Sequence, residues 1–432
     1  NNMAFAKILR NTNLANLIVW SYWWPVIIIS AIFFGRIWCM VCPMELLTSF
    51  AARIGLKRRP HRVVQSGWII TLFYILILFV GIHTLAIHRV PFRMSIYLMA
   101  LMASTIVVGL IFSRNTFCAY ICPVGHLLGL YARLAPFGWS IGNESICSNC
   151  KDHSCTANVN AYIFQGRSCG VGLNPAQLDD NTNCLLCGQC VKSCDHNNPG
   201  SEGRPNPGWF VRPWFKDIFA LKPMTAAQTA FCLIVSGFVI YEVFTEWKVT
   251  KGLLLWMPDT INMWLGTGNT WTHGLIKSLT LFVLLPTLVW LLPYGLLRLI
   301  GGKFPIGRFF TAFGIAFIPI MAAAHTVKAL LKTTSRIPYW EYAFTDPVGV
   351  ESAKGILDKS LQLAPLPTWR GPVVTALSLV LICGGIAVST VVIRKLTMAH
   401  MRDSGCRAWT LYLIPGLYGG AFAAMICIWR LF

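Results

Sequence analysis

Long apolar stretches alternate with shorter polar ones along most of the 432-residue chain. A helix needs about 20 consecutive apolar residues to cross the hydrocarbon core of a bilayer. Pro25, inside the first apolar stretch, is expected to kink its helix because it removes a backbone N–H. We therefore expect an all-α polytopic membrane protein with about eight transmembrane helices: residues 14–35, 67–87, 95–112, 225–244, 274–298, 309–331, 371–393 and 408–429.

Two segments depart from this pattern. Residues 252–265 are apolar but too short to span a bilayer, so we expect an interfacial or re-entrant helix there. Residues 113–222 are polar and separate the third predicted span from the fourth. The sequence thus divides in order into an N-terminal membrane region (1–112), an insert (113–222) and a C-terminal membrane region (223–432).

Composition and charge support this interpretation. The chain is 55% hydrophobic and 12% charged, whereas soluble domains carry about 25% charged residues. Its net charge of +20 is typical of Lys and Arg that flank spans and contact anionic lipid, so no nucleic-acid partner is expected. The basic loop 36–66 places the insert on the cytoplasmic side, most simply of a bacterial inner membrane, although Lys7 and Arg10 then lie outside. The start at Asn1 suggests a missing upstream segment.

Half of the sixteen cysteines lie within residues 147–194. The last four follow the bacterial ferredoxin spacing C-x2-C-x2-C-x3-C, in which the fourth cysteine ligates a neighbouring cluster. Two [4Fe–4S] clusters are therefore predicted. The first cluster set is Cys147, Cys150, Cys155 and Cys194. The second cluster set is Cys169, Cys184, Cys187 and Cys190.

Disulfides and zinc are the alternatives for these cysteines. Disulfides favour short secreted chains, and zinc explains two C-x2-C pairs but not the additional cysteine in a run of four. The spacing from Cys150 to Cys155 is two residues longer than usual, and Asp195 rather than proline follows Cys194. These departures loosen the loop geometry of the first cluster without changing its ligand count.

A short motif occurs twice, at the cytoplasmic ends of two predicted spans. Residues 34–43 and 112–123 each contain an arginine, an aromatic residue, a close cysteine pair and a proline, which points to a paired structural unit. The four cysteines, here called the Cys-Pro group, are Cys39, Cys42, Cys118 and Cys122. They would form a third iron–sulfur centre or a redox-active dithiol, with Arg36 and Arg114 favouring thiolates. Packing of kinked helix ends is the alternative.

Other side chains are weaker candidates. A pair of histidines at equal depth on adjacent helices would bind a haem b, and a single one would bond a quinone carbonyl; ordinary interfacial histidines are the alternative. Glu242, inside the fourth predicted span, would accept a quinol proton or extend to the interface. The histidines near the outer ends of spans are His83, His88, His273 and His325. The cysteines expected only to pack are Cys232, Cys383, Cys406 and Cys427.

Over about residues 15–200 the chain resembles the membrane-bound polyferredoxins of the NapH and NosR type. The resemblance rests on both Cys-Pro motifs and on the two cluster sets. It implies electron transfer between a quinone pool and partner redox proteins. The chain departs from that pattern in having two residues, not three, between Cys39 and Cys42, and no recognisable flavin-carrying domain. The last two hundred residues lie outside the resemblance.

The expected function is that of a membrane electron-transfer subunit in a quinol-linked oxidoreductase complex. It would relay single electrons through [4Fe–4S] clusters between quinone or quinol and partner subunits, such as a flavoprotein or a cytochrome. A maturation factor that reduces a metal ion for cofactor assembly is one alternative. A structural anchor of a respiratory or photosynthetic complex is another. No nucleotide-binding or C-x-x-C-H motif occurs in a usable context, so hydride transfer by this chain alone is not expected.

Overall fold

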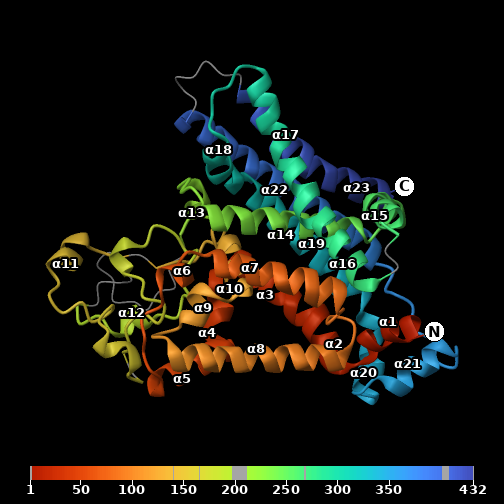
Figure 1. Ribbon diagram of the computed structural model, residues 1–432, viewed down its shortest axis with the longest axis horizontal. Helices are drawn as coiled ribbons and strands as arrows, with labels where there is room; N and C mark the ends of the chain where they lie inside the picture. Colours follow the sequence, from red (N-terminus) through yellow and green to blue (C-terminus); the bar gives the residue numbers. More distant parts are fainter. Residues whose placement is uncertain are drawn as a thin grey trace. The chain divides into compact units, whose positions relative to one another are not determined.

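The computed structural model describes residues 2–139, 141–164, 166–196, 212–266, 269–400 and 408–431. Over these residues the chain is helical and has no β-strand, apart from one isolated bridge between Arg58 and Phe112 (Figure 1). One further apolar helix, Trp68–Thr84, is shorter than a typical span. Within the described residues, seven helices are long and apolar enough to cross a membrane: Leu14–Val41, Pro91–Ile111, Ala226–Phe244, Trp271–Leu299, Ile306–Ser335, Arg370–His400 and Trp409–Leu431.

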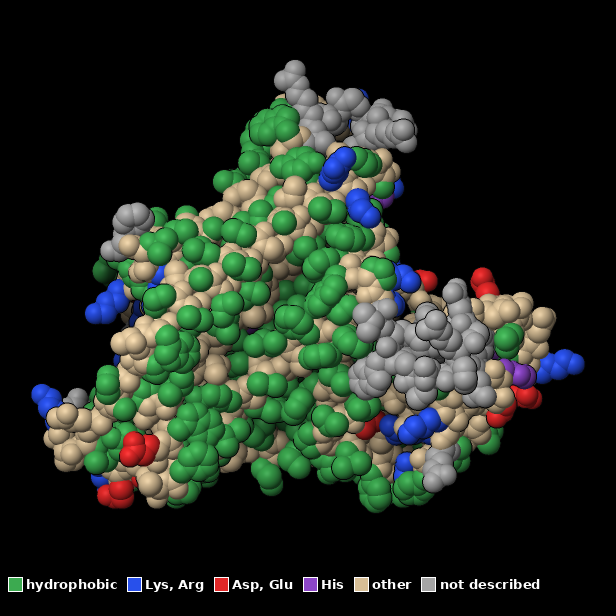
Figure 2. Space-filling model, turned by 180° about the vertical axis from the view of Figure 1, so that it is seen from behind, with side chains coloured by type: hydrophobic (Ala, Val, Ile, Leu, Met, Phe, Trp, Pro, Cys, Tyr) green, Lys and Arg blue, Asp and Glu red, His purple; other side chains and the backbone are tan. Residues whose placement is uncertain are grey.

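These eight segments overlap the eight predicted spans, which confirms the helical membrane fold. Their outward surfaces are apolar, as Figure 2 shows over much of one face. Leu72, Met99 and Val380, for example, are 61–68% exposed. Side chains of this kind contact lipid in a bilayer, where only hydrogen-bonded backbone such as a helix is tolerated.

The chain folds into two compact units whose segments interleave along the sequence. The first unit comprises Asn1–Ile28, Tyr74–Leu98 and Leu221–Phe432. The second unit comprises Ile29–Phe73 and Met99–Ala220, and it contains the Cys-Pro group and both cluster sets. The three regions expected from the sequence are consecutive along the chain. Each compact unit instead combines segments that are separated in the sequence.

The second unit is built from short helices around two longer ones. Gly55 and Gly109 let the end of α5 approach the end of α8, because a Cβ on Gly55 would collide with the Leu110 carbonyl. The Leu56 N–H donates to that carbonyl at 2.6 Å. The helices are α4 (Trp38–Val41), α5 (Pro43–Ile54), α6 (Arg62–Gln65), α7 (Trp68–Leu76, shared with the first unit), α8 (Pro91–Ile111, shared with the first unit), α9 (Thr116–Tyr120), α10 (Pro123–Ala132), α11 (Glu144–Asn149), α12 (Gln189–Lys192) and α13 (Lys216–Phe219).

The first unit holds most of the long helices. Its core centres on Leu78, Ile234, Leu281 and Phe282, which are 0–4% exposed. The helices are α1 (Asn2–Thr12), α2 (Leu14–Leu17), α3 (Trp24–Phe34, shared with the second unit), α14 (Ala226–Phe244), α15 (Lys248–Trp264), α16 (Thr270–Leu279), α17 (Leu285–Leu299), α18 (Ile306–Phe313), α19 (Ile318–Ser335), α20 (Trp340–Thr345), α21 (Val350–Leu357), α22 (Arg370–His400) and α23 (Gly420–Leu431).

Two local expectations have clear outcomes. Near the kink expected at Pro25 the structure has a π-helical turn, η1 (Ile18–Trp23), which ends two residues before the proline. Such a turn changes the hydrogen-bonding pattern where proline removes a donor. The short segment expected near 252–265 is the helix α15, whose Trp256 and Trp264 are 68% and 84% exposed. Exposed tryptophans are typical of the membrane–water interface.

Candidate metal centres

The two Cys-Pro motifs adopt the same local structure. Cys42 and Cys122 are the N-caps of α5 and α10, and each helix begins with the following proline. The residue before a proline favours an extended backbone, and proline suits the first helical position because no N–H is needed there. Each thiol therefore lies at the positive end of a helix dipole, which favours a thiolate. The Gly125 N–H also donates to Cys122 Sγ at 3.3 Å.

The two copies contact each other through equivalent positions. Arg36 and Asn115 each lie three residues before the first cysteine of their copy. Arg36 lies against Gly125, where a Cβ would be 2.7 Å from Nη2, and Asn115 donates to Glu45 Oε1 at 2.7 Å. Gly125 and Glu45 in turn each lie two residues after their proline. The copies are thus related like the halves of a two-fold pair.

This arrangement changes how the copies align. Matching the arginines pairs Arg36 with Arg114, but counting from the first cysteine pairs Arg114 with Gly35. Gly35 and Arg114 both have a positive φ, of 65° and 55°. The Arg114 side chain accordingly makes different contacts from the Arg36 side chain. Its guanidinium donates to the carbonyl of Cys169 at 2.5 Å and to that of Thr156 at 2.6 Å.

Arg36, which is 3% exposed, lies beside three members of the Cys-Pro group. Arg36 interacts electrostatically with Cys39, Cys122 and Cys118. Burial raises the pKa of the Cys122 thiol to about 12, and burial followed by the neighbouring thiols raises that of Cys118. Thiolates at these positions therefore need strong positive charge nearby. A four-thiol donor set of this kind fits an iron–sulfur cluster.

The first cluster set lines one pocket, together with His153, His196 and Asn174. The pKa of Cys155 is raised by burial first and then by Cys194, Cys147 and Cys150. These are the three partners that spacing predicts. The loop is held by a hydrogen bond from the Cys169 N–H to the Cys155 carbonyl at 2.8 Å, so the two cluster sets share backbone contacts.

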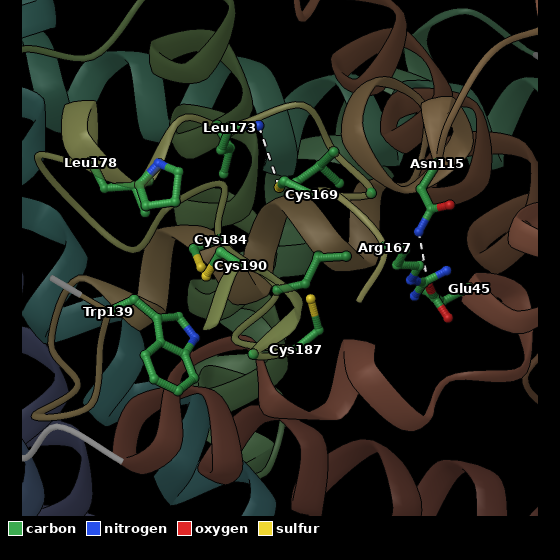
Figure 3. A pocket seen from close by; sticks show the side chains of 15 residues that line it. Glu45, Asn115, Trp139, Arg167, Cys169, Leu173, Leu178, Cys184, Cys187 and Cys190 are labelled. Atoms are coloured by element: carbon green, nitrogen blue, oxygen red, sulfur yellow. Dashed lines mark hydrogen bonds and ion pairs between the residues drawn. The ribbon is translucent and has the colours of Figure 1, made fainter. Parts of the chain in front are cut away.

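The second cluster set lines another pocket, with Trp139 beside it (Figure 3). Backbone N–H groups of Leu173 and Leu186 donate to the sulfurs of Cys169 and Cys184 at 3.3 and 3.4 Å. Burial raises the pKa of Cys184 to about 12. Hydrogen bonds to ligand sulfurs are one means by which proteins set cluster potentials, so this pocket has features that suit a cluster.

A buried ionic network borders the second cluster set. Arg167 forms an ion pair with Glu45 at 2.8 Å and donates to Ser49 Oγ at 2.9 Å. Glu45 is 8% exposed and also accepts from Asn115, and Figure 3 shows this network beside Cys187. Sequence analysis missed Arg167, Glu45 and Asn115. The signal for Glu45 and Asn115 lay in their spacing from the Cys-Pro motifs, which becomes evident only when the two copies are aligned on their first cysteines. No such signal marks Arg167.

Among the described residues, no three or more His, Cys, Asp or Glu side chains are placed to hold a single metal ion.

The remaining candidates lie in the first unit. His325 is 3% exposed and packs against Trp24 and Phe238. Glu242 forms an ion pair with Lys328 at 3.1 Å. Cys232 is fully buried, Cys383 is exposed and Cys427 is half-buried, while Cys406 lies outside the described residues. His83 and His88 pack against Tyr241 and Trp20, and His273 lies 3.8 Å from Asp259.

Comparison with known proteins adds an independent observation. The profile of a family described as a 4Fe-4S binding domain matches residues 16–61 and 95–142, which contain the Cys-Pro group. An uncharacterized protein of Methanocaldococcus jannaschii is 25% identical over 177 residues, or 39% of this chain and 65% of that protein. Protein NirI of Paracoccus denitrificans is 25% identical over 203 residues, or 41% of this chain and 27% of NirI. No solved structure matches.

The aligned stretches thus cover less than two thirds of either relative. The family profile covers both copies of the repeat and ends before residues 147–194. Together with the apolar helices, the match identifies an integral membrane iron–sulfur protein of the 4Fe-4S type.

Proposed function

We propose that this protein transfers single electrons between the quinone pool and partner redox subunits. The first and second cluster sets would each hold a [4Fe–4S] cluster, and the Cys-Pro group would hold a third iron–sulfur centre. The observation that carries the proposal is that these twelve cysteines form three groups of four within one compact unit. A bound [4Fe–4S] cluster gains and loses one electron at a potential set by its surroundings.

Residues of the chain connect the three groups. Arg36 Nη1 donates to the Thr182 carbonyl at 3.2 Å, two residues before Cys184, while Nη2 donates to the Cys118 carbonyl at 3.5 Å. Arg114 similarly joins the backbone at Cys169 to the backbone beside Cys155. These two arginines support a continuous path from the Cys-Pro group through the second cluster set to the first.

The same side chains control the environment of the thiols. Arg36 and Arg114 place positive charge beside sites that become more negative on reduction, which favours the reduced state. Trp139 lines the pocket that contains the second cluster set. We further propose the NapH and NosR type of arrangement, with the cysteine-rich segment on the cytoplasmic side of a bacterial inner membrane and a flavoprotein or cytochrome as partner.

Iron and acid-labile sulfide per chain test the metal content. Twelve irons and twelve sulfides are expected for three [4Fe–4S] centres, and eight of each would contradict the third. The double variant Cys39→Ser and Cys118→Ser should lose four irons and one EPR signal of the reduced protein. Cys232→Ser, a buried cysteine outside the three groups, is the matched control and should lose none.

Quinol oxidation needs a separate measurement. A water-soluble quinol added to the oxidised protein should bleach the iron–sulfur absorbance and produce the EPR signals of reduced clusters. Bound copper together with no reduction by quinol would contradict the proposal and favour a maturation factor. Clusters that cannot be cycled between dithionite and a mild oxidant would favour a structural anchor.

A further inference from the structure

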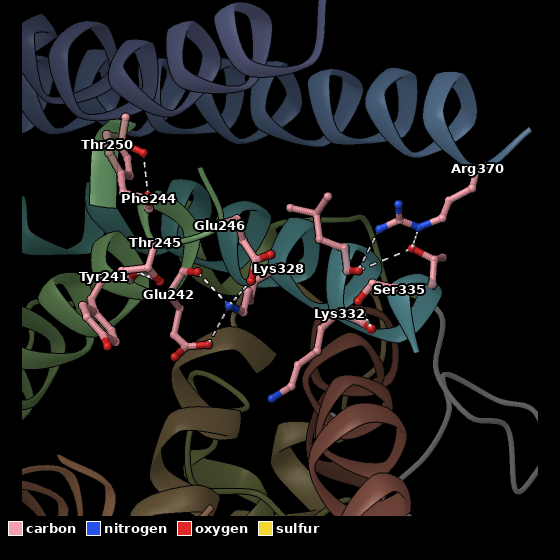
Figure 4. Close-up of polar contacts among 12 residues, drawn as sticks. Tyr241, Glu242, Phe244, Thr245, Glu246, Thr250, Lys328, Lys332, Ser335 and Arg370 are labelled. Carbon is pink, nitrogen blue, oxygen red and sulfur yellow. Dashed lines mark hydrogen bonds and ion pairs between the residues drawn. The ribbon is translucent and has the colours of Figure 1, made fainter. Parts of the chain in front are cut away.

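Within the first unit, the ends of α1, α14 and α19 gather charged side chains that the proposed function does not use. Glu242 and Glu246, at the end of α14, both pair with Lys328 of α19, at 3.1 and 2.6 Å (Figure 4). Lys328 also donates to the Glu242 carbonyl at 2.8 Å. These three side chains therefore pair with one another and together carry one net negative charge.

Four more cations lie around it: Arg10, Arg89, Lys332 and Arg336. The Asn16 side chain donates to the carbonyls of both Arg10 and His88, at 3.2 and 3.5 Å, which holds the end of α1 beside Arg89. The pKa of Arg10 falls to about 10, first through burial and then through repulsion by Arg336 and Arg89. Positive charge thus exceeds negative charge in a half-buried place, which is costly unless an anion offsets it.

Three of these cations have no acceptor within the described part of the chain, whereas Arg89 Nε donates to His88 Nε2 at 3.1 Å. Within the described part of the chain, the side chains of Arg10 and Lys332 make no hydrogen bond or ion pair, and Arg336 Nε is buried without a partner. In Figure 4 the Lys332 side chain extends beside Glu242 and its ammonium carries no dashed line. Buried polar groups in proteins are almost always paired, so the buried Arg336 Nε lacks an acceptor, and the unpaired Arg10 and Lys332 side chains add two more donors in the same cluster.

A simpler role for these cations would be to offset the dipoles at helix C-termini. At the end of α19 that role is already filled, because Arg370 Nη2 donates to the Leu331 carbonyl at 3.3 Å and Nε donates to Thr334 Oγ1 at 3.0 Å. Lys332 does neither. A neutral ligand such as a quinone would leave the excess positive charge in place.

We propose that Arg10, Lys332 and Arg336 bind an anion with phosphate-type oxygens. Guanidinium and ammonium groups form their strongest hydrogen bonds with such oxygens. The site lies where the apolar segments Ala226–Phe244 and Ile306–Ser335 end, the depth at which lipid headgroups lie. The phosphate therefore belongs to an anionic phospholipid or to a free oxyanion, and the two sources share this chemistry. The inference is independent of the cysteines and of the proposed electron transfer.

The test uses the full chain, purified in detergent and stripped of lipid. One arm titrates inorganic phosphate and follows the thermal unfolding midpoint. The other reconstitutes the protein with phosphatidylglycerol or phosphatidylcholine and measures retained lipid by native mass spectrometry. The variants are Lys332→Gln and Arg10→Gln. Lys354→Gln is the matched control, because that lysine is exposed on α21 of the same unit.

A free-oxyanion site is supported if phosphate raises the thermal unfolding midpoint of the protein. The apparent affinity for phosphate should then be at least tenfold weaker in Lys332→Gln and in Arg10→Gln, but not in Lys354→Gln. Preferential retention of phosphatidylglycerol, lost in the same two variants, supports a headgroup site. No response in either arm, or equal responses in all variants, overturns the proposal. Iron content, which reports on the other unit, must stay unchanged for a variant to be counted as folded.

Discussion

Replacing Arg36 by Gln removes a buried positive charge from between the Cys-Pro group and the second cluster set. Arg36 is 3% exposed and donates to the carbonyls of Thr182 and Cys118. Glutamine can retain one of these hydrogen bonds but carries no charge. A positive charge stabilises the more negative, reduced form of a cluster, so its removal should lower the midpoint potential.

The size of the shift follows from Coulomb's law. Unit charges about 8 Å apart, a spacing that allows for charge spread over a cluster and a guanidinium, interact by about 2 kcal/mol at an effective dielectric constant of about 20. For a one-electron couple, about 1.4 kcal/mol corresponds to about 59 mV. We expect the potential of the third centre to fall by about 50–100 mV. The second centre should shift less, because Arg36 approaches only Cys184 of that set.

Redox titration followed by EPR measures both potentials in one sample. Arg36→Lys keeps the positive charge, so it should change the midpoint potential of the third centre by at most about a third as much as Arg36→Gln does. Arg114→Gln is a second control, because Arg114 contacts the backbone at Cys169 and Thr156 and should leave the third centre unchanged. Equal shifts in the Gln and Lys variants, or none in either at full iron content, would refute the electrostatic reasoning.

Three further changes have defined outcomes. Gly129→Ala should lower the thermal midpoint, with a loss of roughly 1–3 kcal/mol, because its Cβ would collide with the Thr182 carbonyl; the same change at Gly384, which has open space around it, should not lower it. Arg167→Gln removes the cation that pairs with the buried Glu45 carboxylate, and chemical unfolding should show a loss of about 3 kcal/mol in the free energy of unfolding. A loss under about 0.5 kcal/mol would contradict a stabilising role for this network. Burial lowers the pKa of His126 to about 3, so as the pH falls the unfolded chain binds a proton at this histidine before the folded chain does. The free energy of unfolding should therefore fall by up to about 1.4 kcal/mol per pH unit below about pH 6.5. A His126→Phe variant with the same pH dependence would count against this.

Much of the fold follows from hydrophobic length alone. A lipid-facing helix needs an uninterrupted apolar stretch, and the last predicted span, 408–429, corresponds to the helix Trp409–Leu431. Cysteine spacing was similarly informative, because closely spaced ligands in one loop must lie together whatever the remaining fold. Spacing placed Cys194 with Cys147 and Cys155, and the structure brings these three side chains to one pocket.

Contacts between distant segments could not be predicted in this way. Arg36 meets Gly125, and Asn115 meets Glu45, across separations of roughly 70 to 90 residues. No local pattern specifies which residue lies opposite which, and matching identical letters favoured Arg114 as the counterpart of Arg36. The cation cluster around Lys332 escaped notice for the same reason, because its members come from three separate segments.

The paired Cys-Pro motifs also have a consequence for the symmetry of the proposed electron path. Two identical copies related by a two-fold axis would offer their surroundings the same face twice, and an electron would meet no preferred way through. Here both copies contain two cysteines and a proline, although two residues separate the cysteines in the first copy and three in the second. The contact positions differ, with Arg36 and Gly125 on one side and Asn115 and Glu45 on the other. The different side chains at these few positions therefore make the two sides of an otherwise two-fold scaffold electrostatically unequal.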